Sequence, residues 1–293
     1  MLKKEYIVGA ENVLFAYLLS LGFKRTRIKQ FLKYRTVSVN GKAVERHDHR
    51  LLPGDRVSLS SEKKAAPSGV PKLGIKILYE DDAVLVIDKP AGLLTIGTEK
   101  ERAKTAYFQL NEYLRERAPD KRERVFIVHR LDRETSGLIV FAKTETAKRR
   151  LQDNWDKADK LYLAVVEGVP KKNEDTIAGY LNETSTFRVY ETKASNNAKY
   201  AVTKYKILKK SREYSLLEID IETGRKHQIR VHLSGMGNPV AGDRKYGAQT
   251  DPLKRLALHA HRLSFPHPVT KKSMEFESRL PRSFDQLVSR MKA

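Results

Sequence analysis

Cysteine is absent from the 293-residue sequence. This absence excludes a disulfide framework, a thiolate metal site, an iron–sulfur cluster and a cysteine nucleophile. No apolar run approaches the roughly 18 residues of a membrane span, and the N-terminal segment lacks the features of a secretory signal. We therefore expect a cytoplasmic protein that does not bind membranes. The phosphate-binding patterns Gly-x-x-x-x-Gly-Lys-Ser/Thr and Gly-x-Gly-x-x-Gly are missing as well, so we predict no ATP, NAD or flavin cofactor.

Acidic residues are few relative to basic ones. The chain has 36 Asp and Glu against 57 Lys and Arg, which gives a net charge of +21. Such an excess favours a polyanionic partner, because neutralised phosphates release their condensed counterions. A highly charged surface that serves only solubility is the alternative. Hydrophobic residues make up 40% of the chain, which is enough for a folded core.

The segment 61–74 (SEKKAAPSGVPKLG) contains two prolines and two glycines and little apolar periodicity, as linkers do. We therefore predict a small α/β module over residues 1–60, a linker over 61–74 and a larger domain over 75–293. Apolar spacing in the module predicts two helices, and VSVNGKAV predicts a hairpin around an Asn-Gly turn. A short strand is expected over 56–59.

The larger domain shows strand patterns that follow one another without a regular helix between them. This order predicts an α+β fold with a mainly antiparallel sheet. An amphipathic helix is expected over 104–117. The expected strands cover 75–79, 83–88, 137–142, 160–167, 201–208 and 214–221.

The segment 128–140 (VHRLDRETSGLIV) places one carboxylate between two arginines, directly before an apolar strand. Neighbouring guanidinium groups favour the ionised form of Asp132, which can act as a nucleophile or a base. A structural interpretation competes with this one: Asp132 caps the turn, while Arg130 and Arg133 pair with surface acids. The residues alone leave both interpretations open.

A second basic segment, 223–233 (TGRKHQIRVHL), begins with a tight turn at Gly224 and continues as a helix. Arg225, Lys226 and Arg230 near the helix start suit a phosphate or a carboxylate. This cluster is the best candidate to supply an ionic partner for Asp132. In the strand 160–168, Tyr162 is by default a core residue.

Three histidines close together, His259, His261 and His267, raise the question of a zinc site. No acidic ligand is interleaved with them, and core or RNA-contacting histidines are commoner. We predict no metal site.

Taken in order, six segments resemble the RluA-type pseudouridine synthases. They are ILYEDDAVLVIDKPAGLLT (77–95), VHRLDRETSGLIVFAKT (128–144), KLYLAVVEG (160–168), TGRKHQIRVHL (223–233), GNPVAGDRKYG (237–247) and LHAHRLSFPHP (258–268). The module before the linker is similar to the S-four RNA-binding module, through its basic second helix, its VSVNGKAV hairpin and LLPGDRVSL. One departure is Lys226, where the family more often has threonine.

The resemblance implies a large, mostly antiparallel mixed sheet with flanking helices and a central RNA cleft. It implies isomerisation of uridine in RNA to pseudouridine without a cofactor. Asp132 is then the catalytic carboxylate, Tyr162 stacks on the uracil and helps to deprotonate carbon five, and Arg230 forms a salt bridge with Asp132. The implied RNA-binding residues are Arg130, Arg225 and His227 in the large domain, and Lys24, Arg25, Arg27, Lys29 and Lys33 in the module.

We expect ribosomal RNA as the substrate, transfer RNA as the second choice, and a monomeric enzyme. Whether Asp132 attacks the sugar, attacks the base or removes a proton stays open at this point. A non-catalytic RNA-binding or ribosome-assembly factor is the first alternative. A metal-dependent nuclease ranks last, because it needs several carboxylates around a cation and only Asp132 is well placed.

Overall fold

The computed structural model describes residues 4–33, 37–44, 46–59, 74–97, 99–117 and 123–289. The chain forms two compact units, Met1–Lys72 and Leu73–Ala293, which are described separately. Of the expected linker 61–74, all but Gly74 lies outside the described residues.

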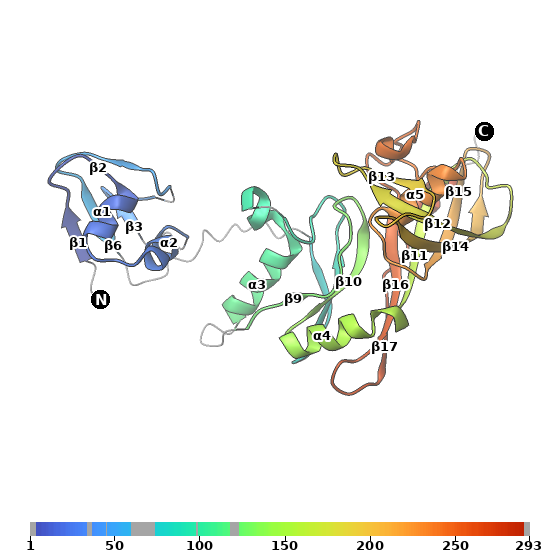
Figure 1. Ribbon diagram of the computed structural model, residues 1–293, viewed down its shortest axis with the longest axis horizontal. Helices are drawn as coiled ribbons and strands as arrows, with labels where there is room; N and C mark the ends of the chain where they lie inside the picture. Colours follow the sequence, from blue (N-terminus) through green and yellow to red (C-terminus); the bar gives the residue numbers. More distant parts are fainter. Residues whose placement is uncertain are drawn as a thin grey trace. The chain divides into compact units, whose positions relative to one another are not determined.

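The first unit combines two helices with short antiparallel strands (Figure 1). Its elements are β1 (Lys4–Ile7), β2 (Asn12–Val13), α1 (Leu14–Ser20), α2 (Arg25–Lys33), β3 (Val37–Val39), β4 (Lys42–Ala43), β5 (Arg50–Leu51) and β6 (Arg56–Leu59). Four strands form a sheet in the order β1-β6-β3-β4, and β2 pairs with β5. Asn40 and Gly41 both have positive φ, as the expected two-residue turn between β3 and β4 requires. Leu14, Leu18 and Ile28 bury the helices against the strands.

An 11-stranded sheet forms the frame of the second unit. Its main path runs β13-β12-β14-β15-β11-β16-β10-β8-β7, with β17 paired to β16 and β9 paired to β10. In the described residues every pairing of this sheet is antiparallel except that of β10 with β16. The strands are β7 (Lys76–Glu80), β8 (Val84–Lys89), β9 (Phe126–Ile127), β10 (Ser136–Ala142), β11 (Asp159–Glu167), β12 (Glu174–Glu183), β13 (Val189–Thr192), β14 (Lys199–Lys210), β15 (Tyr214–Ile221), β16 (Leu258–Pro266) and β17 (Ser273–Glu277).

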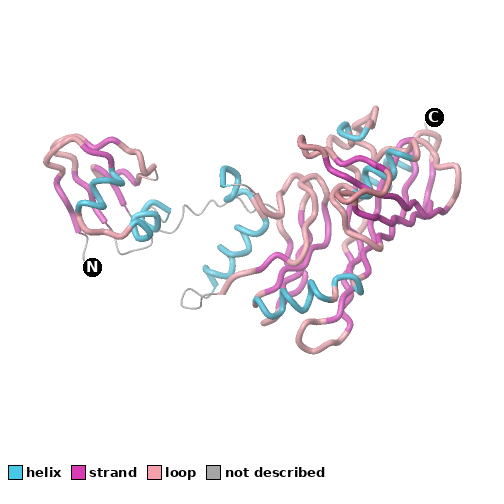
Figure 2. The backbone as a smooth tube through the Cα atoms, in the orientation of Figure 1, coloured by secondary structure: helices cyan, strands magenta, loops and turns pink. Residues whose placement is uncertain are grey.

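Helices flank the strands of this sheet, which Figure 2 shows in magenta. They are the 3-10 helices η1 (Glu99–Lys104), η2 (Trp155–Lys157) and η3 (Arg244–Tyr246), and the α-helices α3 (Ala106–Arg117), α4 (Glu145–Asp153), α5 (Gln228–Gly235) and α6 (Arg282–Ser289). Helix α3 packs through Leu110 and Leu114 onto β8 and β10. Helix α5 packs against β13 and β14, and helix α6 packs against β11, β14 and β15. The expected α+β fold with a mainly antiparallel sheet is confirmed.

Two helix starts differ from the expected ones. The helix expected from residue 104 begins at Ala106, because the Thr105 side chain accepts a hydrogen bond from the Phe108 backbone N–H and caps it there. Helix α5 begins only at Gln228, because His227 before it adopts a left-handed conformation with φ 53°. The predicted strand 214–221 has the same bounds as β15.

The parallel contact between β10 and β16 fixes the position of the loop that carries Asp132. It consists of two residue pairs, Ser136 with His259 and Gly137 with Ala260. Ala260 in turn lies opposite Tyr162 on β11. This contact therefore brings the end of the Asp132 loop next to the strand that carries Tyr162.

Candidate active site

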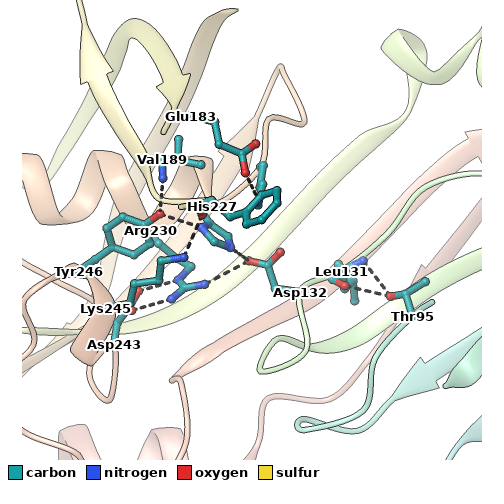
Figure 3. Close-up of polar contacts among 12 residues, drawn as sticks. Thr95, Leu131, Asp132, Glu183, Val189, His227, Arg230, Asp243, Lys245 and Tyr246 are labelled. Atoms are coloured by element: carbon teal, nitrogen blue, oxygen red, sulfur yellow. Dashed lines mark hydrogen bonds and ion pairs between the residues drawn. The ribbon is translucent and has the colours of Figure 1, made fainter. Parts of the chain in front are cut away.

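Asp132 lies in the loop between β9 and β10, and hydrogen bonds hold the backbone on both sides of it. The Thr95 hydroxyl accepts a hydrogen bond from the Leu131 N–H at 3.2 Å and donates one to the Leu131 carbonyl at 2.9 Å (Figure 3). On the other side, the buried Lys89 ammonium donates to the Arg133 carbonyl at 3.2 Å. The loop therefore presents Asp132 from a fixed backbone.

The Asp132 side chain lies between two adjoining hollows of about 270 and 260 Å³. It is 24% exposed, so it can meet a ligand. Both hollows are lined by Arg130, Leu131, Asp132, His227 and Arg230. The first is also lined by Tyr162 and Arg225, and the second by Thr95 and Lys245.

Arg230 reaches Asp132 from α5, as the resemblance implied. Its Nη1 lies 3.4 Å from Asp132 Oδ2. Its closest partner, however, is Asp243: Arg230 Nε and Nη2 donate to the two Asp243 carboxylate oxygens at 2.7 Å each. Burial lowers the pKa of Arg230, but the two carboxylates outweigh burial and raise it overall. Arg230 therefore contacts two carboxylates, Asp243 and Asp132, of which the sequence suggested only Asp132.

His227 is the second group that faces Asp132. Its Nε2 lies 3.7 Å from Asp132 Oδ2, and its Nδ1 lies 2.7 Å from the Tyr246 hydroxyl. Burial lowers the pKa of His227 to about 4, although the Asp132 charge acts in the opposite direction. His227 is therefore neutral at pH 7. The resemblance implied an RNA-binding role for it, and the structure brings it next to Asp132.

Tyr162 packs against the apolar residues on both sides of it and also lines the first hollow. Burial raises the pKa of its phenol, and the Asp132 charge raises it further. The phenol is therefore protonated at neutral pH. The core position and the site position, which the sequence left as alternatives, are combined in one residue.

The remaining basic residues of the two motifs have different surroundings. Arg130 and Arg225 are exposed at the first hollow, and Arg225 Nε donates to the Tyr200 carbonyl at 3.1 Å. Arg133 pairs with Glu101 at 2.8 Å, as the structural interpretation expected for this arginine. Lys226 forms an ion pair with Glu183.

In the first unit, the cations Lys24, Arg25 and Arg27 are exposed at the start of α2. We call these three residues the α2 cations. The side chains of Lys29 and Lys33 lie outside the described residues.

The three histidines near the C-terminus have separate partners. His259 Nδ1 contacts the Ser136 hydroxyl, His261 Nδ1 contacts the Ser278 carbonyl, and His267 Nε2 contacts Asp81. Within the described part of the chain, no group of three His, Cys, Asp or Glu side chains could hold a metal ion. No described helix is long and apolar enough to cross a membrane.

Sequence reasoning did not identify Asp243 and Tyr246 as site residues. The segment 237–247 contributes to the resemblance only as one of its six matching segments. Its Gly-Asp-x-x-Tyr-Gly spacing was the available signal.

Comparison with known proteins places the chain in a family. The family model described as RNA pseudouridylate synthase matches residues 83–235. The uncharacterized RNA pseudouridine synthase YlyB of Bacillus subtilis is 34% identical, over 92% of this chain and 90% of its own. Ribosomal large subunit pseudouridine synthase D of Yersinia pestis is 33% identical, over 92% and 87%. A coverage of 92% exceeds what Leu73–Ala293 alone could supply, so these matches extend into the first unit.

Solved structures agree with the sequence matches. Human RNA pseudouridylate synthase domain containing 4 is 27% identical and superposes with a TM-score of 0.61, over 72% of this chain and 90% of its own. Human RNA pseudouridylate synthase domain containing 1 is 26% identical, with a TM-score of 0.58 over 76% and 95%. From the family model, the relatives and the shared fold, it follows that this chain belongs to the RNA pseudouridylate synthase family.

Proposed function

We propose that this enzyme isomerises specific uridines of ribosomal RNA to pseudouridine, with Asp132 as its catalytic carboxylate. The observation that carries the proposal is an accessible carboxylate on a fixed loop, faced by Arg230 and His227 and lying in the same hollow as Tyr162. The ribosomal substrate is supported by the relatives named ribosomal large subunit pseudouridine synthase D and by the net charge of +21.

The reaction moves one bond of the substrate and needs no redox partner. The bond between N1 of uracil and C1′ of ribose breaks, the base turns, and C5 bonds to C1′. The proton on C5 leaves and N1 gains a proton, so that the atoms balance. Asp132 can attack C1′, attack the base or remove a proton, and each of these acts requires the ionised carboxylate.

Tyr162 is proposed to stack on the uracil and to take part in the removal of the C5 proton. Because its phenol is protonated in the free enzyme, it can accept that proton only after its own proton has left. The substitution Tyr162→Phe keeps the ring and removes the hydroxyl. We expect Tyr162→Phe to bind RNA normally and to turn over slowly, whereas Tyr162→Leu should also bind more weakly.

Arg130 and Arg225 are proposed to contact the RNA around the target nucleotide, which must leave its stack to reach Asp132. Extruding a base costs a few kcal/mol, which contacts between a cationic groove and the phosphates offset.

The first unit is proposed to act as an S-four-like RNA-binding module through its α2 cations. We further propose that the enzyme works as a monomer in the cytoplasm, with transfer RNA as the alternative substrate.

The experiment is tritium release from RNA labelled at carbon five of uridine. Ribosomal and transfer RNA transcripts are assayed separately, in a buffer that contains a chelator. Asp132→Asn is compared with Asp153→Asn, which removes an exposed carboxylate on α4. We expect release from ribosomal RNA by the wild type and by Asp153→Asn, and none by Asp132→Asn. Release that survives Asp132→Asn would refute the role of Asp132, and release from transfer RNA alone would refute the ribosomal substrate.

A further inference from the structure

One short turn holds both groups that face Asp132. The segment 242–247 contains η3, and its Asp243 and Tyr246 are 2% and 5% exposed. The Tyr246 N–H donates to the Asp243 carbonyl at 3.0 Å, and the Ser234 hydroxyl donates to the Tyr246 carbonyl at 2.6 Å. Gly242 has φ 82°, and a Cβ on it would lie 2.3 Å from the Arg255 carbonyl oxygen. The turn is therefore rigid and closely packed.

Asp243 orients the guanidinium of Arg230. Nε and Nη2 of Arg230 are both taken up by the Asp243 carboxylate. A bidentate pair of this kind fixes the plane of the guanidinium. With that plane fixed, Nη1 is the nitrogen presented to Asp132 Oδ2 (Figure 3).

Tyr246 orients the imidazole of His227. The Val189 N–H donates to the Tyr246 hydroxyl oxygen at 3.1 Å, which leaves the hydroxyl proton for His227 Nδ1 at 2.7 Å. A neutral imidazole whose Nδ1 accepts a hydrogen bond carries its proton on Nε2. The Nε2–H then faces Asp132 Oδ2. The other tautomer would place a nitrogen lone pair opposite the carboxylate.

Both contacts reach the same carboxylate oxygen. Arg230 Nη1 and His227 Nε2 approach Asp132 Oδ2 at 3.4 and 3.7 Å. These distances exceed those of a good hydrogen bond, and catalytic contacts commonly tighten once substrate is bound. No contact of this kind to Oδ1 is found among the described residues.

We propose that Asp243 and Tyr246 are positioning residues which, through Arg230 and His227, anchor Oδ2 of Asp132 and leave Oδ1 as the oxygen that reacts. This inference rests on the proposed catalytic role of Asp132. It gives the turn 242–247 a function in the chemical step. Both positioning residues are buried, so their effect is proposed to act through Arg230 and His227.

Tyr246→Phe tests the inference, because it removes one hydroxyl and keeps the buried ring. We expect kcat to fall roughly ten- to hundredfold, the size of loss known for hydrogen-bond partners of metal-bound histidines, while KM changes less than about twofold. Tyr214→Phe is the matched control: its hydroxyl donates to the Thr250 hydroxyl at 3.0 Å and does not line either hollow. It should retain wild-type kcat. A wild-type kcat in Tyr246→Phe, or a change confined to KM, would overturn the inference.

Nitrogen NMR of ¹⁵N-histidine-labelled protein tests the tautomer without any turnover. The His227 signals, assigned by their loss in His227→Gln, should report a proton on Nε2 in the wild type and a mixture of tautomers in Tyr246→Phe. A proton on Nδ1 in the wild type, or an unchanged spectrum in Tyr246→Phe, would overturn the inference. Because this measurement needs no substrate, a failure of the proposed function, seen as absent tritium release, is distinguishable from a failure of the positioning.

Asp243→Asn provides the second arm. The amide keeps the shape of the carboxylate and loses its charge, so Arg230 is held less firmly. We expect kcat to fall with KM nearly unchanged, and Asp81→Asn, which removes a hydrogen-bonded carboxylate away from both hollows, to leave kcat at the wild-type value. An Asp243→Asn protein that folds and retains wild-type kcat contradicts the inference. If it does not fold, Tyr246→Phe and the NMR spectra decide alone.

Discussion

Gly137→Ala should separate the two strands whose contact fixes the Asp132 loop. Gly137 has φ 111°, and a Cβ on it would lie 2.2 Å from the carbonyl oxygen of Ala260 and 2.7 Å from its nitrogen. Both atoms belong to the backbone of β16, so no side chain can move aside. The strands would have to part by about 1 Å or more to reach an ordinary contact.

The expected loss of stability has two parts. The positive φ costs an alanine roughly 1–2 kcal/mol, and forcing extra volume into a closely packed site costs roughly 1–3 kcal/mol more. Gly237→Ala isolates the first part, because Gly237 has φ 86° and no heavy atom within 4 Å of its added Cβ. At roughly 2–4 °C per kcal/mol, we expect Tm to fall by roughly 4–20 °C in Gly137→Ala and less in Gly237→Ala.

Urea denaturation and calorimetry of both variants measure the difference, and tritium release measures its consequence. Gly137→Ala should also lose turnover, since Ala260 lies beside both Gly137 and Tyr162. Gly237→Ala should retain it. If the two variants differ by less than about 0.5 kcal/mol, the close approach of β10 to β16 is not what makes glycine necessary, and the reasoning fails.

Three further perturbations test the charges. Arg230→Met leaves the Asp243 carboxylate, 1% exposed, without a cation and should lower the free energy of unfolding by about 3–5 kcal/mol in urea denaturation. Adding Asp243→Asn should restore part of that stability but not turnover. A double variant no more stable than the single variant contradicts the proposal that the two residues form a stabilising buried pair. Burial lowers the pKa of both His232 and His259 to about 4. Between pH 6.5 and 4 the unfolded chain therefore binds more protons than the folded chain. The free energy of unfolding should fall as pH falls through that window, by up to about 1.4 kcal/mol per pH unit for each histidine. His259→Gln should flatten this dependence, and a urea midpoint equal at pH 7 and pH 5 would be the contrary result. Glutamine at the three α2 cations should raise KM for RNA and reduce its salt dependence without changing kcat, so a lower kcat at saturating RNA would argue against a pure binding role.

The sequence predicted those strands whose apolar residues follow a clear pattern along the chain. Strand β15 alternates buried and half-buried positions along its C-terminal half, and its bounds follow from its sequence. Strand β12 carries few large apolar residues and lies next to the edge of the sheet, so its sequence gives a weak signal. The place of β16 in the centre of the sheet depends on its pairings with distant segments, which its own sequence does not reveal.

The candidate site was predictable to the extent that motifs mark it. The two motifs indicated Asp132 and Arg230, and the structure brings these residues to 3.4 Å. The part played by Asp243 was not predictable, because it depends on how η3 packs against α5. The same holds for Tyr246, whose hydroxyl meets His227 and the backbone of β13 only in the folded chain.

The division of Arg230 between two carboxylates bears on reactivity. Asp243 is nearly inaccessible and binds the guanidinium at 2.7 Å through two nitrogens, whereas Asp132 is 24% exposed and meets it only at 3.4 Å. A carboxylate bound through both oxygens has fewer lone pairs left for a substrate than one bound through a single oxygen. Because Arg230 binds Asp243 through two short contacts and Asp132 through one longer contact, the guanidinium faces Asp132 without forming a close bidentate pair with it. The three groups together carry one net negative charge, and that charge faces the hollow where the uridine is proposed to bind.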